Sequence, residues 1–305
     1  MQRIRTTLIG TGVAAVLALG SCLAPGMTPA ANALATTSDW RALSATSCPA
    51  VSGVRMGDYH TPQGATQGGG YIYVIFSNHA VADATLLTKW SWDGAKVSSA
   101  KCTIAVAFGP GKSANLRHGN GVTYHPNYNG TGPKLLVTDG TNGVSGAGSN
   151  SPWVMVVNAI NLSAVTAFTF KNAAGNDVRA ASICYSSAAH KYVVRNGKTL
   201  YVWGESNNKP KATPEKTFTD THSTWNATQG LDCSTDNIYT VVTSGDNTHI
   251  NQYRWTGAYV RQLNLSGVGE GEGLFHYNGK FYLTINNQPA SRGSTPDVIR
   301  GLASW

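Results

Sequence analysis

The chain has 305 residues, and its 23 Lys and Arg against 15 Asp and Glu give a formal net charge of +8 at pH 7. The basic residues are scattered and are not densely interleaved with aromatic residues, which argues against nucleic-acid binding. A scattered basic excess fits either attraction to anionic polymers such as a cell wall or ordinary solubility.

The first 35 residues are predicted to be an export signal outside the fold. The basic start MQRIR is followed by the apolar stretch TTLIGTGVAAVLALG and by small residues at 31–35 that suit signal cleavage. The apolar stretch is too short for a membrane span, so residues 36–305 are predicted to be a single secreted domain. The alternative is a lipid anchor through Cys22, because LGSC loosely resembles a lipobox.

A polar residue, usually followed by Gly, recurs nine or ten residues before an aromatic or aliphatic strand; one copy has a longer turn. The copies lie 43 to 62 residues apart and start at Gln63, Asn120, Ser182, Gln229 and Glu272. Periods of this length indicate supersecondary units that stack and bury one another.

The strand pattern predicts an all-β fold. Windows with helical periodicity are nearly absent, whereas short alternating runs are bounded by Gly, Asn, Asp and Pro. A second repeat, WSWDGAKV (90–97) and YRWTGAYV (253–260), follows the polar motif of its own unit. These features favour a single five-bladed β-propeller of four-stranded antiparallel blades, with a β-sandwich as the alternative.

The last repeat leaves room for only three strands. We therefore expect an N-terminal strand, from around Ser47–Val54, to complete the last blade and close the ring. The polar segments 141–152 and 204–224 are predicted to be loops on a propeller face.

Four cysteines remain after the predicted signal, and an even number in an exported chain favours two disulfides. Cys184 and Cys233 lie near the starts of equivalent repeat strands, so they are expected to pair if those strands are neighbours. Cys48 and Cys102 are then the remaining pair. No cysteine or histidine pair has zinc-site spacing.

The inner strands of a propeller line a central channel, so the repeated polar residues are predicted to meet there. The neutral members are candidate substrate-binding residues: Gln63, Asn120, Ser182 and Gln229. The competing interpretation is that they only form hydrogen bonds between blades.

Two copies differ from the rest. In RHGNG, His118 is a candidate general acid or base and Arg117 a candidate anion-binding residue. In GEGEG, Glu270 and Glu272 alternate along a strand and are expected to point to one face. Paired carboxylates suit cleavage of a glycosidic bond or, alternatively, binding of Ca²⁺.

No nucleotide-binding glycine motif, P-loop or nucleophile elbow occurs, so no cofactor other than the alternative Ca²⁺ is expected. Aromatic residues could stack on sugar rings or pack in the core. The candidates are Trp153, Trp225, Tyr124, Tyr128 and Tyr185.

The segments RHGNGVTYHP…KLLVTDG, ATQGLDCSTDNIYTVVTSGD and GEGEGLFHYNGKFYLTIN resemble the repeats of helveticin J-type class III bacteriocins and of related propellers of phage tails and Gram-positive surfaces. The resemblance covers residues 118–287. It implies an extracellular, antimicrobial propeller that binds or attacks envelope glycans, and it supplies no catalytic residues. The alternative is a secreted glycoside hydrolase or polysaccharide lyase. The expected partner is a polysaccharide, and the expected state is a monomer.

Overall fold

A computed structural model describes residues 40–78, 84–109, 112, 119–138, 153–223, 227–244, 247–265, 267–286 and 298–302. Almost all of the regular structure in them is β-strand. The remaining regular elements are the single 3-10 turns η1 (Ala45–Ser47), η2 (Met56–Asp58), η3 (Val97–Ser99) and η4 (Tyr128–Gly130). Arg117, His118 and the predicted export signal lie outside the described residues.

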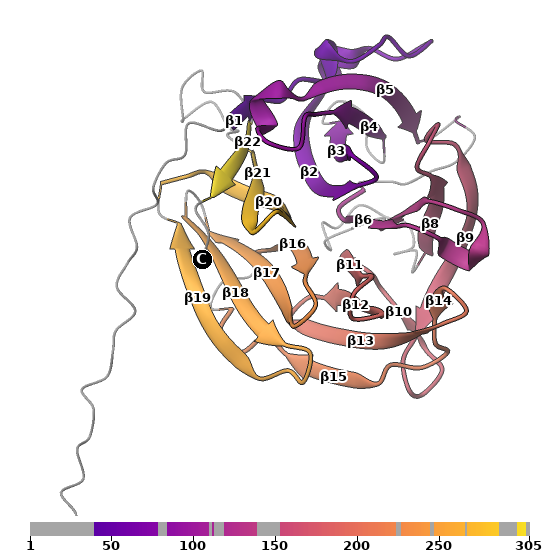
Figure 1. Ribbon diagram of the computed structural model, residues 1–305, viewed down its shortest axis with the longest axis vertical. Helices are drawn as coiled ribbons and strands as arrows, with labels where there is room; N and C mark the ends of the chain where they lie inside the picture. The colour runs from indigo at the N-terminus through magenta and orange to yellow at the C-terminus, as the bar shows by residue number, and fades with distance from the viewer. Residues whose placement is uncertain are drawn as a thin grey trace, which may run out of the picture. The chain divides into compact units, whose positions relative to one another are not determined.

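The strands form five antiparallel sheets arranged as the blades of a propeller (Figure 1). Blade 1 contains β2 (Tyr59–Gly68), β3 (Tyr71–Asn78), β4 (Thr85–Ser91) and β5 (Lys101–Phe108). Blade 2 contains β6 (Val122–His125), β7 (Lys134–Thr138), β8 (Trp153–Asn158), β9 (Ala164–Lys171) and the short β10 (Asp177–Val178). Blade 3 contains β11 (Ser182–Ser186), β12 (Lys191–Asn196), β13 (Thr199–Ser206), β15 (Lys216–Thr219) and the short β14 (Lys209–Pro210). The predicted all-β, five-bladed propeller is thus confirmed by this arrangement.

The last two blades complete the ring. Blade 4 contains β16 (Ala227–Cys233), β17 (Asn237–Ser244), β18 (Asn247–Arg254) and β19 (Tyr259–Leu265). Blade 5 contains β20 (Glu270–Tyr277), β21 (Lys280–Asn286), β22 (Val298–Leu302) and the N-terminal β1 (Trp40–Ala42). Since β1 pairs antiparallel with β22, the prediction that an N-terminal strand closes the ring is confirmed.

The closing strand was predicted around Ser47–Val54, and this position was wrong. The closing strand ends at Ala42, and the chain then enters η1, where the Ser44 hydroxyl accepts a hydrogen bond from the Thr46 backbone. Pro49 follows directly and has no N–H to donate to a sheet. Segment 204–224 was likewise predicted as a loop, but it contains β14 and the outer strand β15.

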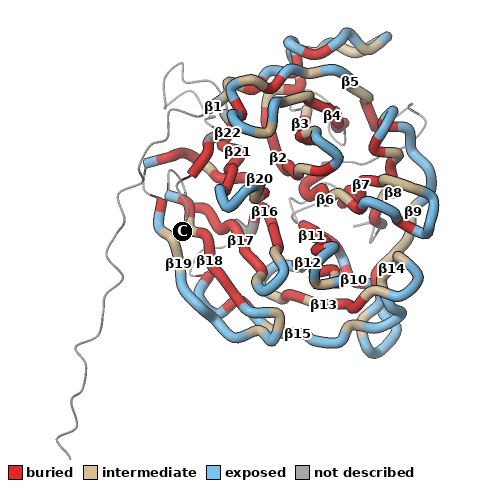
Figure 2. Tube along the Cα trace, viewed as in Figure 1, coloured by how far each residue is buried: buried red, intermediate tan, exposed pale blue. Residues whose placement is uncertain are grey.

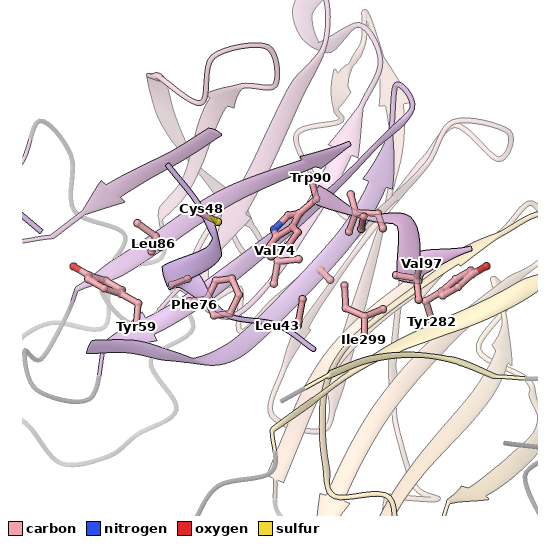
Figure 3. Close-up of a cluster of buried hydrophobic side chains, with 14 of the residues drawn as sticks. Leu43, Cys48, Tyr59, Val74, Phe76, Leu86, Trp90, Val97, Tyr282 and Ile299 are labelled. Carbon is pink, nitrogen blue, oxygen red and sulfur yellow. The ribbon is translucent and has the colours of Figure 1, made fainter. Parts of the chain in front are cut away.

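Each junction between neighbouring blades buries its own apolar cluster, so every blade is packed on both faces. At the junction of blades 1 and 5, Trp90 and Phe76 face Ile299, and Leu43 from the segment after β1 packs with them (Figure 3). Burial falls toward the rim, where the residues of the outer strands are mostly exposed or half-buried (Figure 2). The apolar side chains buried between neighbouring blades therefore hold the blades in the ring.

Both predicted disulfides are present. Cys48 joins Cys102, with 4.9 Å between the Cα atoms, and ties the segment after η1 to the outer strand of blade 1. Cys184 joins Cys233, with 6.0 Å between the Cα atoms, and links the inner strands of blades 3 and 4.

Candidate functional site

The five inner strands, β2, β6, β11, β16 and β20, contact one another in sequence and close a ring around the propeller centre (Figure 1). The glycines of the repeated motif allow this close approach, because a Cβ at each would meet a neighbouring inner strand. The distances from such a Cβ are 2.5 Å to Asn120 O for Gly64, 2.8 Å to Ser182 Cα for Gly121, 2.6 Å to Glu272 O for Gly230 and 2.6 Å to Ala65 N for Gly273. The polar residues that precede these glycines therefore lie at one level of the ring.

Three of the inner strands carry a β-bulge at this level. The register with the second strand shifts at Gln63–Gly64, at Gln229–Gly230 and at Glu272. A bulge inserts an extra residue and re-aims its side chain. The prediction of regular alternation from Glu270 to Glu272 was therefore wrong, because Glu272 is the inserted residue.

The two glutamates nevertheless meet at one amide. Asn286 Nδ2 lies 3.2 Å from Glu270 Oε2 and 3.5 Å from Glu272 Oε1. Gln229 Nε2 donates to Glu270 Oε1 at 3.2 Å. The structure thus brings together three residues singled out in the sequence and adds Asn286, which lies at the end of β21 outside the repeated motif.

The remaining ring residues, Gln63, Asn120 and Ser182, are also buried. Asn120 Nδ2 and Ser182 Oγ have no hydrogen-bond partner among the described residues. Buried polar atoms normally have a hydrogen-bond partner. Since these two have none among the described residues, each can bind a water molecule or a ligand.

A pocket of about 370 Å³ lies at the opposite ends of the same inner strands. All five strands, or the turns that follow them, contribute to its wall. The lining residues with hydroxyl, amide or ionisable groups are Thr66, Gln67, Thr123, Tyr124, Tyr185, Ser186, Ser187, Asp232, Ser234, Thr235 and His276. Its volume is in the range of small-ligand sites.

An ion pair lies in the wall of this pocket. His276 Nδ1 lies 2.7 Å from Asp232 Oδ2, which joins β20 to β16. The Asp232 carboxylate raises the pKa of His276 and outweighs the opposing effect of burial. Neither residue belongs to the repeated motif, although they follow Gln229 and Glu272 by three and four positions and so recur as polar residues at the far ends of inner strands.

A hydrogen-bonded network around Glu205 fixes Tyr185 in the same wall. The Tyr185 hydroxyl donates to Glu205 Oε1 at 2.9 Å, and the His125 ring stacks on Tyr185 with centroids 4.0 Å apart. His125 Nε2 and His190 Nδ1 also contact the Glu205 carboxylate, at 2.9 and 2.6 Å. Burial, with the nearby Glu205, raises the pKa of Tyr185, so the ring is a neutral, rigid surface.

The aromatic candidates are divided between two places. Tyr124 and Tyr185 line the central pocket, whereas Tyr128 lines a groove between blades 2 and 3. Trp225 and the side chain of Trp153 lie outside the described residues.

The His276–Asp232 pair makes stability dependent on pH. The folded pKa of His276 is raised above its unfolded value of about 6.5, so its stabilisation is complete below that pH and is lost as the pH rises through the folded pKa. We expect urea titrations from about pH 5.5 to about pH 8.5 to show the largest deficit of His276→Gln against wild type at the acid end. A deficit that grows with pH would contradict the assignment.

Within the described ranges, no group of three or more His, Cys, Asp or Glu residues could hold a metal ion. The described residues also contain no helix long and apolar enough to span a membrane.

No protein-family model and no curated protein matches the sequence. Among solved structures, the chain is similar to a tail fibre of Staphylococcus aureus phage P68, with 12% identity and a TM-score of 0.49 over 87% of this chain and 53% of the fibre chain. It is similar to the dihydro-heme d1 dehydrogenase NirN, with 16% identity and a TM-score of 0.40 over 76% of this chain and 44% of NirN. The chain thus spans about half the length of these two. A glutaminyl cyclase of Myxococcus xanthus aligns with 11% identity and a TM-score of 0.46, over 80% of this chain and 90% of the cyclase. None of these likenesses carries an argument about function.

Proposed function

We propose that this protein is an exported propeller that binds a glycan, such as a bacterial envelope polysaccharide, in the central pocket. The observation that carries the proposal is the pocket wall, to which all five inner strands or their turns contribute. Hydroxyl and amide side chains of β2, β6, β11 and the turn after β16 lie there beside the rings of Tyr124 and Tyr185, and β16 and β20 add Asp232 and His276. Sugar rings bind to proteins through such hydroxyl and amide groups and through aromatic faces. Two disulfides suit the oxidising environment outside the cell.

The charge balance of the pocket indicates which class of sugar it suits. Among the described residues that line it, Asp232 is the only carboxylate and His276 the only imidazole, and none is Lys or Arg. The two side chains neutralise each other when His276 is protonated. A neutral sugar unit fits this balance better than an anionic one. The Asp232 carboxylate is suited to accept hydrogen bonds from sugar hydroxyls, because hydrogen bonds to a charged acceptor are stronger than those to a neutral one.

A glycan array that includes peptidoglycan fragments and neutral bacterial oligosaccharides tests the proposal. We expect wild type to bind at least one neutral probe and Asp232→Asn to bind it about tenfold or more weakly, because a hydrogen bond to a charged group contributes about 1.5–3 kcal/mol. Asp177→Asn on the exposed rim of blade 2 is the matched control and should bind as wild type. Absence of glycan binding, or equal binding by Asp232→Asn, would overturn the proposal.

A second candidate function is cleavage of the glycan at the other end of the channel. The favouring observation is that Glu270 and Glu272 reach the same Asn286 amide, which brings two carboxylates close together. Such a pair can act as acid and as nucleophile or base. In this hypothesis His118 assists proton transfer, and the substrate is held by Gln63, Asn120, Ser182, Gln229 and Arg117.

Product analysis in the same glycan screen separates the two functions. Release of shorter sugars by wild type, lost in Glu272→Gln with an unchanged melting temperature, would establish the enzyme. Binding without any product would leave only the binding function. Growth inhibition of Gram-positive cells by the purified protein would add the antimicrobial role that the motif resemblance implies.

A further inference from the structure

A second hollow lies at the junction of blades 2 and 3, away from the central pocket. It is a groove of about 410 Å³ that is lined by β9, by the turn around β14 and by η4. The backbone N–H of Asn129 donates to the Asn208 carbonyl at 3.0 Å, which ties the turns of the two blades together. The groove is therefore built by two fixed turns and a strand.

The groove is basic. Lys171, Lys209 and Lys211 line it, and no Asp or Glu is among the described residues that line it. Lys171 and Lys211 each pair with a carboxylate beside the groove, Asp177 and Glu215. Lys209 is exposed on β14 and has no ion pair among the described residues, so it adds a net positive charge.

Aromatic rings form another part of the groove. Phe168 is half-buried and stacks on Tyr128, with centroids 5.9 Å apart and planes inclined by 22°. Thr166 and Thr169, which belong to the same strand as Phe168, also line the groove. A ring face beside an ammonium group suits a ligand that has both a sugar ring and an anionic substituent.

We propose that this groove binds a uronic acid unit of an acidic polysaccharide, with the pyranose ring on Phe168 and the carboxylate at Lys209. The aromatic wall favours a sugar ring over a linear phosphodiester chain, which has no ring to stack. The inference extends the proposed glycan function, but it stands on different residues.

The groove and the central pocket belong to the same end of the blades. The turn after β6, whose Pro126 lines the central pocket, continues directly into η4. In an antiparallel blade, the turn from the first to the second strand lies at the same end as the turn from the third to the fourth. A polymer that contacts the neutral pocket can thus present its acidic units to blades 2 and 3.

A galacturonate oligosaccharide, a neutral dextran oligosaccharide and a poly(glycerol phosphate) chain are the probes, measured by calorimetry with the full chain. We expect the galacturonate probe to bind and Lys209→Glu to weaken it about tenfold at low ionic strength, with the wild-type affinity falling as salt increases. Lys280→Glu is the matched control, because Lys280 is also an exposed lysine directly after a tight turn. That variant should bind as wild type.

Three outcomes would overturn the inference: no galacturonate binding, equal binding by Lys209→Glu, or binding of poly(glycerol phosphate) as tight as that of galacturonate. Asp232→Asn separates this inference from the proposed function. If the central pocket does not bind glycans, Asp232→Asn leaves galacturonate binding intact while Lys209→Glu still weakens it. Phe168→Leu, which keeps an apolar side chain but removes the ring, should weaken galacturonate more than it lowers the melting temperature; melting lowered without any loss of binding contradicts the stacking role.

Discussion

Replacing Asp220 with Ala should lower the free energy of unfolding by about 3–5 kcal/mol, because it leaves a buried arginine without its partner. Asp220 and Arg195 are both fully buried, and Arg195 Nη2 lies 3.2 Å from Asp220 Oδ2. Arg195 belongs to blade 3, and its Nη1 donates to the Val241 carbonyl of blade 4 at 3.2 Å. The substitution therefore disrupts the junction between the two blades.

The Asp220 carboxylate is held by further donors. Thr240 Oγ1 donates to Oδ2 at 3.0 Å, the Ser223 N–H donates to Oδ1 at 3.0 Å, and the Tyr253 hydroxyl also donates to Oδ1. Burial lowers the pKa of Arg195 to about 10, so the guanidinium is still charged at neutral pH and needs its counter-ion. Loss of one carboxylate thus leaves a charge and several donors unpaired in the interior.

Denaturant unfolding of Asp220→Ala beside Asp177→Ala checks this expectation. Asp177 pairs with Lys171 on the exposed rim, where an ion pair contributes at most about 1 kcal/mol. Asp220→Asn keeps the shape and part of the hydrogen bonding, so its loss should be smaller than that of Asp220→Ala. Equal small losses for the buried and the exposed aspartate would contradict the role of the buried pair.

The architecture could be predicted because its periodic signal has a direct physical cause. At four of the five contacts between neighbouring inner strands a glycine is needed, because a Cβ there would clash with the next strand, so the polar-Gly motif marks these four contacts along the chain. The copy at Ser182–Ile183 has no glycine. At that position the disulfide from Cys184 to Cys233 joins the inner strands of blades 3 and 4.

The sites were less predictable. The bulge at Glu272 depends on the register with β21, and an alternation rule assumes regular pairing. Asp232 and His276 belong to different blades, so their contact depends on the ring and not on spacing. The basic groove is built from residues about forty positions apart in two blades, none of which forms a motif in the sequence.

The disulfide that joins the inner strands of blades 3 and 4 has a second role, because both of its cysteines line the central pocket. On the chain-entropy account, closing a loop between residues 49 positions apart stabilises the fold by about 4 kcal/mol. The adjoining Tyr185 and Asp232 are the pocket residues to which the proposed function assigns stacking and hydrogen bonding. Removal of this link is therefore expected to affect both stability and ligand affinity.

The double substitution Cys184→Ser/Cys233→Ser should lower the free energy of unfolding by about 4 kcal/mol and weaken glycan binding in the central pocket several-fold. The chain provides a matched control in Cys48→Ser/Cys102→Ser, whose loop spans 54 positions but which lies between η1 and the outer strand of blade 1. The control should lose similar stability, because the loop lengths are similar, and keep its glycan affinity, because Cys48 and Cys102 do not line the pocket. Binding measured well below both melting temperatures separates the two effects. Equal loss of affinity in both variants would show that the inner disulfide acts only through global stability and does not position the pocket wall.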